Sequence, residues 1–166
     1  SKFFMVLAVC IWAPVVVFTK PYIRHAGQGN QFMGFYTMTL GVLMGLAQAA
    51  NFVTMYMFFE MMSLITVPLV LHNATPAARR AGFKYLGYSV FGAGMALAGY
   101  FFIAYYLTVP DFQPGGAIDF SRAAEHPPLL LVAYCLMIVG FGAKAGMMPM
   151  QSWLPAAHPV APAPAS

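Results

Sequence analysis

The segment that decides the fold is residues 140–166, GFGAKAGMMPMQSWLPAAHPVAPAPAS. An apolar run at residues 129–140 precedes it and predicts a membrane helix. Lys144 then stands among glycine and alanine, and the chain beyond it is rich in methionine and proline. A cation inside a membrane helix is costly, and non-helical backbone at membrane depth is tolerated only where protein buries it or water lines it. The segment therefore predicts a helix broken near Lys144 and a polar partner elsewhere in the chain.

The composition is that of an integral membrane protein. Of the 166 residues, 61% are hydrophobic and only 7% are charged, whereas soluble domains carry about 25% charged residues. The net charge of +4 is small and scattered, which excludes nucleic acid as a partner and leaves a role in membrane topology. Cys10 and Cys135 lie in separate apolar runs, so they indicate neither a disulfide framework nor a metal site.

Apolar runs predict an all-α integral membrane protein with about five transmembrane helices, since about 20 apolar residues cross a bilayer. The expected helices cover approximately residues 3–19, 32–50, 52–71, 82–107 and 129–148. The longest loop is expected at 108–128, where Pro-Gly-Gly at 114–116 indicates a turn and a short hairpin. A short helix over 150–157 and an extended proline-rich connection should follow. Residues 1–166 are interpreted as a single membrane domain, a fragment of a larger subunit.

Small residues recur in two of the expected helices. Gly41, Gly45 and Ala49 repeat every four positions in the second helix, and the fourth contains glycines at 87, 92, 94 and 99. Such positions let another helix approach closely, so we expect tight helix packing at both.

The loop charges predict an orientation in the membrane. Cytoplasmic loops of membrane proteins carry an excess of lysine and arginine, and the cationic excess lies in segments 20–31 and 72–84. These basic segments are therefore expected to be cytoplasmic. Their cations are Lys20, Arg24, Arg79, Arg80 and Lys84; the opposite side carries Asp111, Asp119, Arg122 and Glu125.

Glu60 and Lys144 are the candidate catalytic residues, as a proton relay pair. Glu60 lies in the middle of an apolar helix, where a charge costs roughly 2.5–3.5 kcal/mol on insertion scales. A carboxylate near a buried lysine changes how tightly the lysine holds its proton, which is the physical basis of a relay. Two structural alternatives stay open: Glu60 could serve only to lock helices together, and Lys144 could extend to the membrane surface from a helix end.

Lys84 and His158 are further relay candidates, each with a simpler alternative. Lys84 follows two arginines and could be a topology charge. His158, like His72, can titrate near neutrality but could equally be an interfacial or capping residue. The sequence has no cysteine cluster for iron–sulfur centres and no phosphate-binding loop, so we expect this chain to bind no cofactor and no metal.

Three segments together resemble the antiporter-like proton-pumping subunits of respiratory complex I, membrane-bound hydrogenases and multisubunit cation/proton antiporters. They are FFEMMSLITVPLV (58–70), RRAGFKYL (79–86) and residues 140–166 with Trp-Leu-Pro followed by a histidine. The resemblance implies a parent subunit of fourteen helices built from two inverted five-helix repeats. This chain would supply the third to seventh helices and the start of the eighth, as part of an inverted-repeat transporter fold.

The resemblance also implies roles for individual residues. Glu60 would be the carboxylate of the family's Glu–Lys pair and Lys144 its lysine in a broken helix. Lys84 and His158 match positions that are polar in parts of the family. Many relatives have a histidine before Trp-Leu-Pro, where this chain has Gln151 and Ser152, which puts a histidine role there in doubt.

The resemblance implies a proton-translocating subunit of a redox-driven complex of NADH:quinone oxidoreductase or hydrogenase type. Residues 140–166 look most similar to subunits of hydrogenase-type complexes and their complex I-like relatives. Iron–sulfur, flavin or nickel–iron centres are then expected only in partner subunits. The expected partners are other membrane subunits, including further antiporter-like ones, peripheral redox subunits and lipid. The expected location is the inner membrane of a prokaryote, with several crossings. The alternatives are a sodium/proton antiporter module and a helical scaffold without its own ion path.

Overall fold

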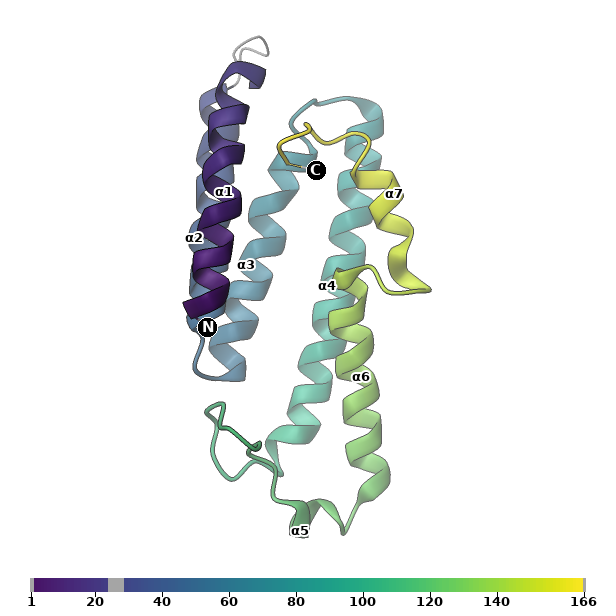
Figure 1. The fold of residues 1–166 in the computed structure, drawn as a ribbon. Coiled ribbons are helices and arrows are strands. Elements are labelled where there is room, and N and C mark those ends of the chain that lie inside the picture. The colour runs from purple at the N-terminus through teal and green to yellow at the C-terminus, as the bar shows by residue number, and fades with distance from the viewer. Residues whose placement is uncertain (1, 24–28, 166) are drawn as a thin grey trace.

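A computed structural model describes residues 2–23 and 29–165, and it is an up-and-down arrangement of long helices (Figure 1). The long helices are α1 (Lys2–Ile23), α2 (Gly29–Gln48), α3 (Phe52–Val70), α4 (Pro76–Ala104) and α6 (Pro127–Ala145). Three short elements complete the order: α5 (Phe120–Ala123), a 3-10 helix η2 (Met150–Trp153) and α7 (Leu154–Ala157). The all-α membrane fold expected from the sequence is confirmed.

Four stretches are long and apolar enough to cross a membrane: Lys2–Pro21, Phe52–Val70, Pro76–Ala104 and Pro127–Ala157. Helix α2 forms with 20 residues but is not one of the four. Its sequence is interrupted by threonine, glycine and glutamine, which lowers its apolar character. The expected number of about five therefore holds for long helices, and four of them qualify as membrane spans among the described residues.

Helix α4 begins earlier than the sequence predicts, at Pro76 instead of residue 82. The Thr75 side chain accepts a 3.0 Å hydrogen bond from the Ala78 amide and caps the helix, and Pro76 suits the first helical position because its missing N–H would be unpaired there anyway. Arg79 and Arg80 consequently lie in the helix and not in the preceding loop.

Helix α1 also runs past its expected end at residue 19, and continues through Pro21 to Ile23. A proline this close to the end of a helix removes only one backbone hydrogen bond.

Close packing of α4 against α6 depends on glycine. A Cβ atom at Gly140 would lie 2.5 Å from the Ala96 amide nitrogen and 2.6 Å from the Gly92 carbonyl oxygen. Gly99 lies equally close to α6, where a Cβ would stand 2.7 Å from the Ala133 carbonyl oxygen. The close approach expected of the fourth helix is confirmed at positions 92 and 99. At positions 41, 87 and 94, by contrast, an added Cβ would meet nothing within 4 Å among the described residues, so these are not contact points.

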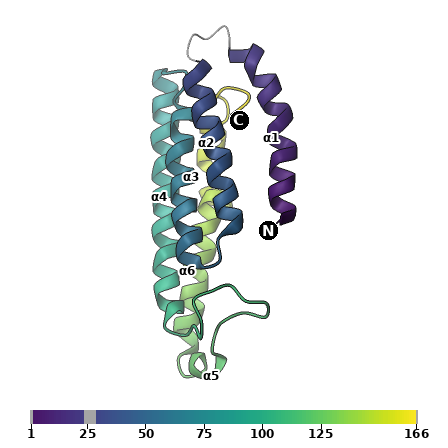
Figure 2. The ribbon, with the colours of Figure 1, turned by 90° about the vertical axis from the view of Figure 1, so that its left-hand side faces the viewer.

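The first two helices form a separate layer beside α3. Figure 2 shows α1 on the outside, next to α2 and away from the pair α4 and α6. A core of Phe32, Tyr36 and Leu69 joins α2 to α3, and Trp12 packs on it from α1. The Trp12 ring stacks on Tyr36 with centroids 5.1 Å apart.

The loop between α4 and α6 contains the expected hairpin turn. An antiparallel bridge pairs Leu107 with Ile118, and the Thr108 amide donates a 2.9 Å hydrogen bond to the Ala117 carbonyl. Gly115 and Gly116 at its tip have φ angles of 89° and 92°, which glycine adopts without steric cost.

The sequence predicts an extended segment after α7, and that prediction is wrong. Its backbone folds into turns, for example where the Ala165 amide donates a 2.8 Å hydrogen bond to the Pro162 carbonyl. The Asn73 side chain also donates a 2.8 Å hydrogen bond to the Val160 carbonyl. These bonds draw the segment back over the α3–α4 turn, as Figure 1 shows.

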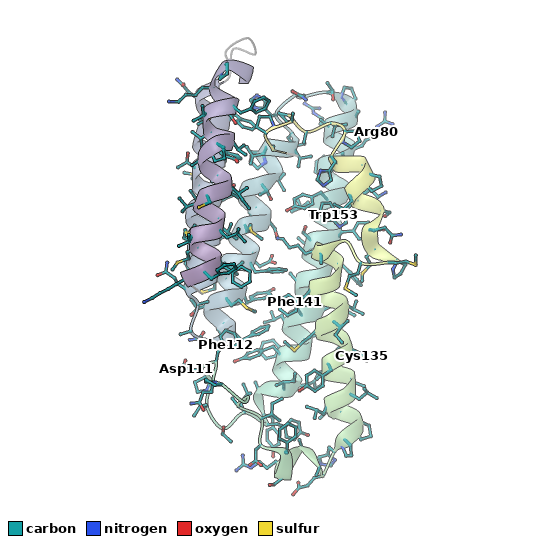
Figure 3. All side chains as sticks on the ribbon, viewed as in Figure 1. Arg80, Asp111, Phe112, Cys135, Phe141 and Trp153 are labelled. Atoms are coloured by element: carbon teal, nitrogen blue, oxygen red, sulfur yellow. The ribbon has the colours of Figure 1, made fainter. Side chains whose placement is uncertain are left out.

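The two ends of the bundle carry different charges. Arg80 lies at the end with the α3–α4 turn, and Asp111 lies in the α4–α6 loop at the other end (Figure 3). The C-terminal end of α1, with Lys20, lies at the same end as Arg80 (Figure 1). Arg24, which also belongs to the predicted basic segments, lies outside the described residues. The bundle thus has a basic end, at the α3–α4 turn, as the loop charges predict.

Candidate functional site

The broken end of α6 places Lys144 in the last helical turn. Gly146 follows at the C-cap with a φ of 72°, in the left-handed region that favours glycine. The Met147 amide reaches back to the Gly142 carbonyl at 2.9 Å, which closes the helix two residues beyond Lys144. The chain then turns and continues as η2 and α7. The helix break predicted near Lys144, and the short helical segment over 150–157, are both present.

The Lys144 side chain crosses from α6 to α3. Its Nζ atom donates a 3.2 Å hydrogen bond to the Phe59 carbonyl and another to the Ser63 hydroxyl. The same atom lies 4.5 Å from the centre of the Phe59 ring, where a ring face attracts a cation. Ser63 is 1% exposed and Lys144 is half-buried, so the hydroxyl that binds the ammonium lies inside the protein.

Glu60 lies on α3 between the two residues that hold Lys144. Its Oε1 atom is buried and has no hydrogen-bond partner within the described chain. Glu60 and Lys144 are near enough to interact electrostatically, but within the described residues no direct ion pair joins them. The ammonium is held by a carbonyl, a hydroxyl and a ring face, while the nearby carboxylate has an oxygen free to accept a proton.

Hydroxyl groups continue from this site toward the basic end of the bundle. Thr66, one helical turn beyond Ser63, hydrogen-bonds the Tyr85 hydroxyl at 2.7 Å. Ser89, one turn from Tyr85 in the direction away from the α3–α4 turn, is also buried. Thr66 and Tyr85 thus place two hydroxyl groups at the α3–α4 contact, between Ser63 and the α3–α4 turn.

Aromatic rings fill the opposite direction, toward the α4–α6 loop. Phe141, three residues before Lys144, meets the Phe59 ring edge-on at 5.4 Å. Phe52 stacks on Tyr100 at 4.1 Å between centroids. The site is therefore asymmetric, with hydroxyls on its basic side and an aromatic layer on the other.

A tryptophan closes the site from the segment after α6. The Trp153 indole donates a 2.8 Å hydrogen bond to the Ala143 carbonyl, and its ring lies 5.0 Å from that of Tyr85. The neighbouring Ser152 hydroxyl bonds the Tyr88 hydroxyl at 2.8 Å. Figure 3 shows Trp153 beside α4, near the end of α6.

The other two predicted relay residues lie outside this cluster. Lys84 is exposed on α4 and lines a shallow pocket with Phe83, Gly87, Tyr88 and Phe91. His158 is exposed at the C-cap of α7. The structure therefore gathers Glu60 and Lys144 but leaves Lys84 and His158 at the surface of the described chain. Within its described residues, no group of three or more His, Cys, Asp or Glu side chains is placed to hold a metal ion.

Sequence reasoning missed Ser63, Thr66, Tyr85 and Trp153 as parts of the site. Ser63 and Thr66 lie three and six positions after Glu60, a spacing that keeps them on neighbouring faces of one helix. That spacing could have identified them. Tyr85 and Trp153 carry no comparable signal, because only the tertiary fold brings them to Lys144.

Comparison with known proteins identifies the family. The family model described as NADH:quinone oxidoreductase/Mrp antiporter, TM, matches residues 49–166. The chain belongs to this family. The matched region runs from the start of α3 to the end of the chain and includes every residue of the Lys144 site. The protein is thus an antiporter-like subunit with several membrane-spanning helices, as the sequence predicts.

Individual family members match nearly the whole chain. It is 31% identical to hydrogenase-4 component B of Escherichia coli, over 98% of this chain and 24% of that protein. It is 29% identical to NADH-quinone oxidoreductase subunit N of Desulfitobacterium hafniense, over 99% of this chain and 33% of that protein. The chain therefore spans about a quarter to a third of the length of these relatives.

A solved structure shares the fold. It is a chain of the membrane-bound sulfane sulfur reductase, an archaeal respiratory membrane complex. The TM-score is 0.77 with 19% identity, over 96% of this chain and 32% of that one. This likeness shows that the two chains share a fold.

Proposed function

We propose that the chain is part of a proton-translocating subunit of a redox-driven membrane complex, of NADH:quinone oxidoreductase or hydrogenase type. The observation that carries this proposal is the Lys144 ammonium, which reaches across to α3 and is held beside Glu60 by the Phe59 carbonyl and the Ser63 hydroxyl. Glu60 and Lys144 are the proposed catalytic pair. Family membership supports the proposal, because the family description covers NADH:quinone oxidoreductases.

The chemistry of the pair is a reversible proton transfer. When the Lys144 ammonium gives a proton to the Glu60 carboxylate, both groups become neutral, and the reverse step restores both charges. Uncompensated charge inside a membrane protein is costly, so the charged state is favoured when the two groups are close. Movement of the ammonium between its α3 oxygen ligands and Glu60 would therefore control where the proton resides.

The remaining assignments are part of the same proposal. Lys84 and His158 are secondary relay candidates, since both are titratable and exposed on the described chain. The redox centres, whether iron–sulfur, flavin or nickel–iron, belong to peripheral partner subunits, and this chain binds none. The complex lies in the inner membrane of a prokaryote, with the basic end of the bundle facing the cytoplasm.

A sodium/proton antiporter module is the second candidate function, because the matching family also covers Mrp antiporters. The same pair would then exchange ions without coupling to electron transfer. The partner subunits distinguish the two: co-purification with iron–sulfur or nickel–iron subunits supports the first function, and a set of small membrane subunits alone supports the second.

The test is proton translocation by the intact complex in membrane vesicles. Glu60→Gln and Lys144→Ala should each lower the translocation rate at least about tenfold, a loss equivalent to about 1.4 kcal/mol in the barrier. Glu125→Gln, a charge-removing change at an exposed acid of the α5–α6 connection, is the matched control and should leave the rate unchanged. Normal assembly with unchanged translocation in both site variants would favour the scaffold alternative and overturn the proposal.

A further inference from the structure

The indole of Trp153 satisfies a backbone carbonyl that the end of α6 leaves open. The last carbonyls of any helix lack intrahelical partners. Here the Met147 amide bonds the Gly142 carbonyl at 2.9 Å, and the Ala143 carbonyl receives the Trp153 indole N–H at 2.8 Å. Ala143 directly precedes Lys144, so this bond fixes the backbone from which the lysine side chain departs.

The ring of Trp153 is held in turn by α4 and α3. It lies 5.0 Å from the Tyr85 ring, and the Tyr85 hydroxyl bonds Thr66 on α3 at 2.7 Å. Thr66 is one turn from Ser63, which binds the Lys144 ammonium. Lys144 is therefore connected to Trp153 in two ways. One is through the backbone of Ala143, and the other is through Ser63, Thr66 and Tyr85.

We propose that Trp153 is a positioning residue for Lys144: its bond to the Ala143 carbonyl and its contact with Tyr85 hold the ammonium against the Phe59–Ser63 site on α3. The functional meaning of this assignment rests on the role proposed above for Lys144, whereas the positioning itself is a separate physical claim. The segment 150–157 is also tied to α4 through Ser152 and Tyr88. A shift of this segment would therefore be transmitted to the lysine.

The experiment measures how readily an amine-specific reagent reaches Lys144. The intact complex in native membranes is treated with acetic anhydride at one fixed pH, and acetylation of Lys144 is quantified by mass spectrometry relative to Lys84, which is exposed. Glu60 on α3 is the titratable group that interacts electrostatically with Lys144, and it is unchanged in the principal variant. Trp153→Phe keeps an aromatic ring beside Tyr85 and removes the five-membered ring of the indole together with its N–H.

Trp153→Phe should raise the acetylation of Lys144 about threefold to tenfold, as expected for the loss of one buried hydrogen bond. The matched control is Trp12→Phe. Trp12 also donates its indole N–H to a backbone carbonyl, that of Tyr36 at 3.3 Å, and also stacks on a tyrosine ring, but in the α1–α2 layer. It should leave Lys144 acetylation unchanged.

Equal acetylation in Trp153→Phe and the unchanged protein would overturn the proposal, and so would an equal rise in both tryptophan variants, which would show general loosening. If Trp153→Phe fails to assemble, Tyr85→Phe, which loses only the hydroxyl bonded to Thr66, should raise acetylation about twofold, and no rise would overturn the proposal. The result does not depend on proton translocation, so a failure of the proposed function, seen as unchanged pumping in Lys144→Ala, is recognised separately.

Discussion

The Lys144 ammonium donates a 3.2 Å hydrogen bond to the carbonyl of Phe59, 85 positions earlier in the chain. This bond joins the broken end of one membrane helix to the middle of another, next to Glu60, whose Oε1 atom is buried. A backbone carbonyl attracts a cation but cannot accept a proton from it, whereas a carboxylate can do both. The oxygen atoms that bind Lys144 thus cannot take its proton, and the carboxylate of Glu60, next to Phe59 in the chain, is the neighbouring group whose chemistry allows it.

Ser63→Ala tests the hydroxyl that completes the ammonium site. The change removes one hydrogen bond to a charged group, and such bonds contribute about 1.5–3 kcal/mol. We expect proton translocation by the assembled complex to fall about tenfold, because the ammonium loses a ligand that fixes its position. The rate is measured in membrane vesicles at matched protein abundance.

Thr39→Ala is the control for Ser63→Ala. Thr39 is 6% exposed and donates its hydroxyl to the carbonyl four residues earlier, that of Phe35, at 2.8 Å. Ser63 makes the corresponding bond to Phe59 at 3.3 Å. A similar loss of translocation in both variants would show that hydroxyl removal acts through helix stability and not through Lys144.

Gly140→Ala tests the close contact between α4 and α6. A methyl group there would meet backbone atoms of Gly92 and Ala96, which cannot move aside independently. We expect the free energy of unfolding to fall by about 1–3 kcal/mol, as for other overpacked cores. Thermal unfolding of the purified full-length protein in detergent provides the measurement. Gly94→Ala, on α4 with open space around it, should not lower the midpoint, and an equal fall would contradict the packing argument.

Gly146→Ala tests the helix stop behind Lys144. The left-handed conformation costs a residue with a Cβ roughly 1–2 kcal/mol, and the new methyl would also press on the Leu154 side chain. The end of α6 should shift, so we expect the midpoint of thermal unfolding to fall. For the same loss of stability, Gly146→Ala should also lower proton translocation more than Gly140→Ala does. The check is to measure the translocation rate and the unfolding midpoint of both variants. A loss that simply follows stability would argue against a specific role for the break.

His72 predicts acid sensitivity at the basic end of the bundle. Burial lowers the pKa of His72 below its usual 6.5, and its ring meets Phe32 edge-on at 5.1 Å. A depressed pKa favours the neutral form in the folded state, so its stabilising effect is complete above pH 6.5 and is lost as the pH falls through the folded pKa. The unfolding midpoint should therefore drop below pH 6.5.

His72→Phe should flatten that acid-side drop, because phenylalanine keeps the ring contact and cannot be protonated. Midpoints are measured between pH 4.5 and 8, a range that brackets the usual histidine pKa of about 6.5. His126→Phe changes an exposed histidine in the α5–α6 connection and should preserve the drop. Identical pH profiles for the His72 variant and the unchanged protein would show that another group is responsible.

The helices and the break near Lys144 could be predicted from the sequence, because local rules govern them. Apolar runs longer than about 18 residues indicate membrane helices whatever surrounds them, and glycine followed by proline stops a helix. The sequence predicts the start of α4 six residues too late, because two arginines at 79 and 80 are typical of a loop. In the structure, the capping hydrogen bond of Thr75 sets the start of the helix.

The chain by itself determined which residues are chemically unusual. Glu60 and Lys144 stand out because charges are rare and costly in apolar helices, and that cost requires a polar environment for each. The family of the protein follows from the same segments. Lys84 and His158 also stand out as titratable groups, but the sequence holds no information on whether they lie near the pair.

Only the tertiary structure decided how the lysine is held. Hydrogen-bond partners depend on distances of about 3 Å, and such distances are set by how α3, α4 and α6 pack, not by spacing along the chain. The glycine contacts that bring α6 against α4, together with the Trp153 bond at its broken end, direct Lys144 to the Phe59 carbonyl and the Ser63 hydroxyl. The sequence predicted a partner for the cation, and the packing of three helices determined which oxygen atoms bind it.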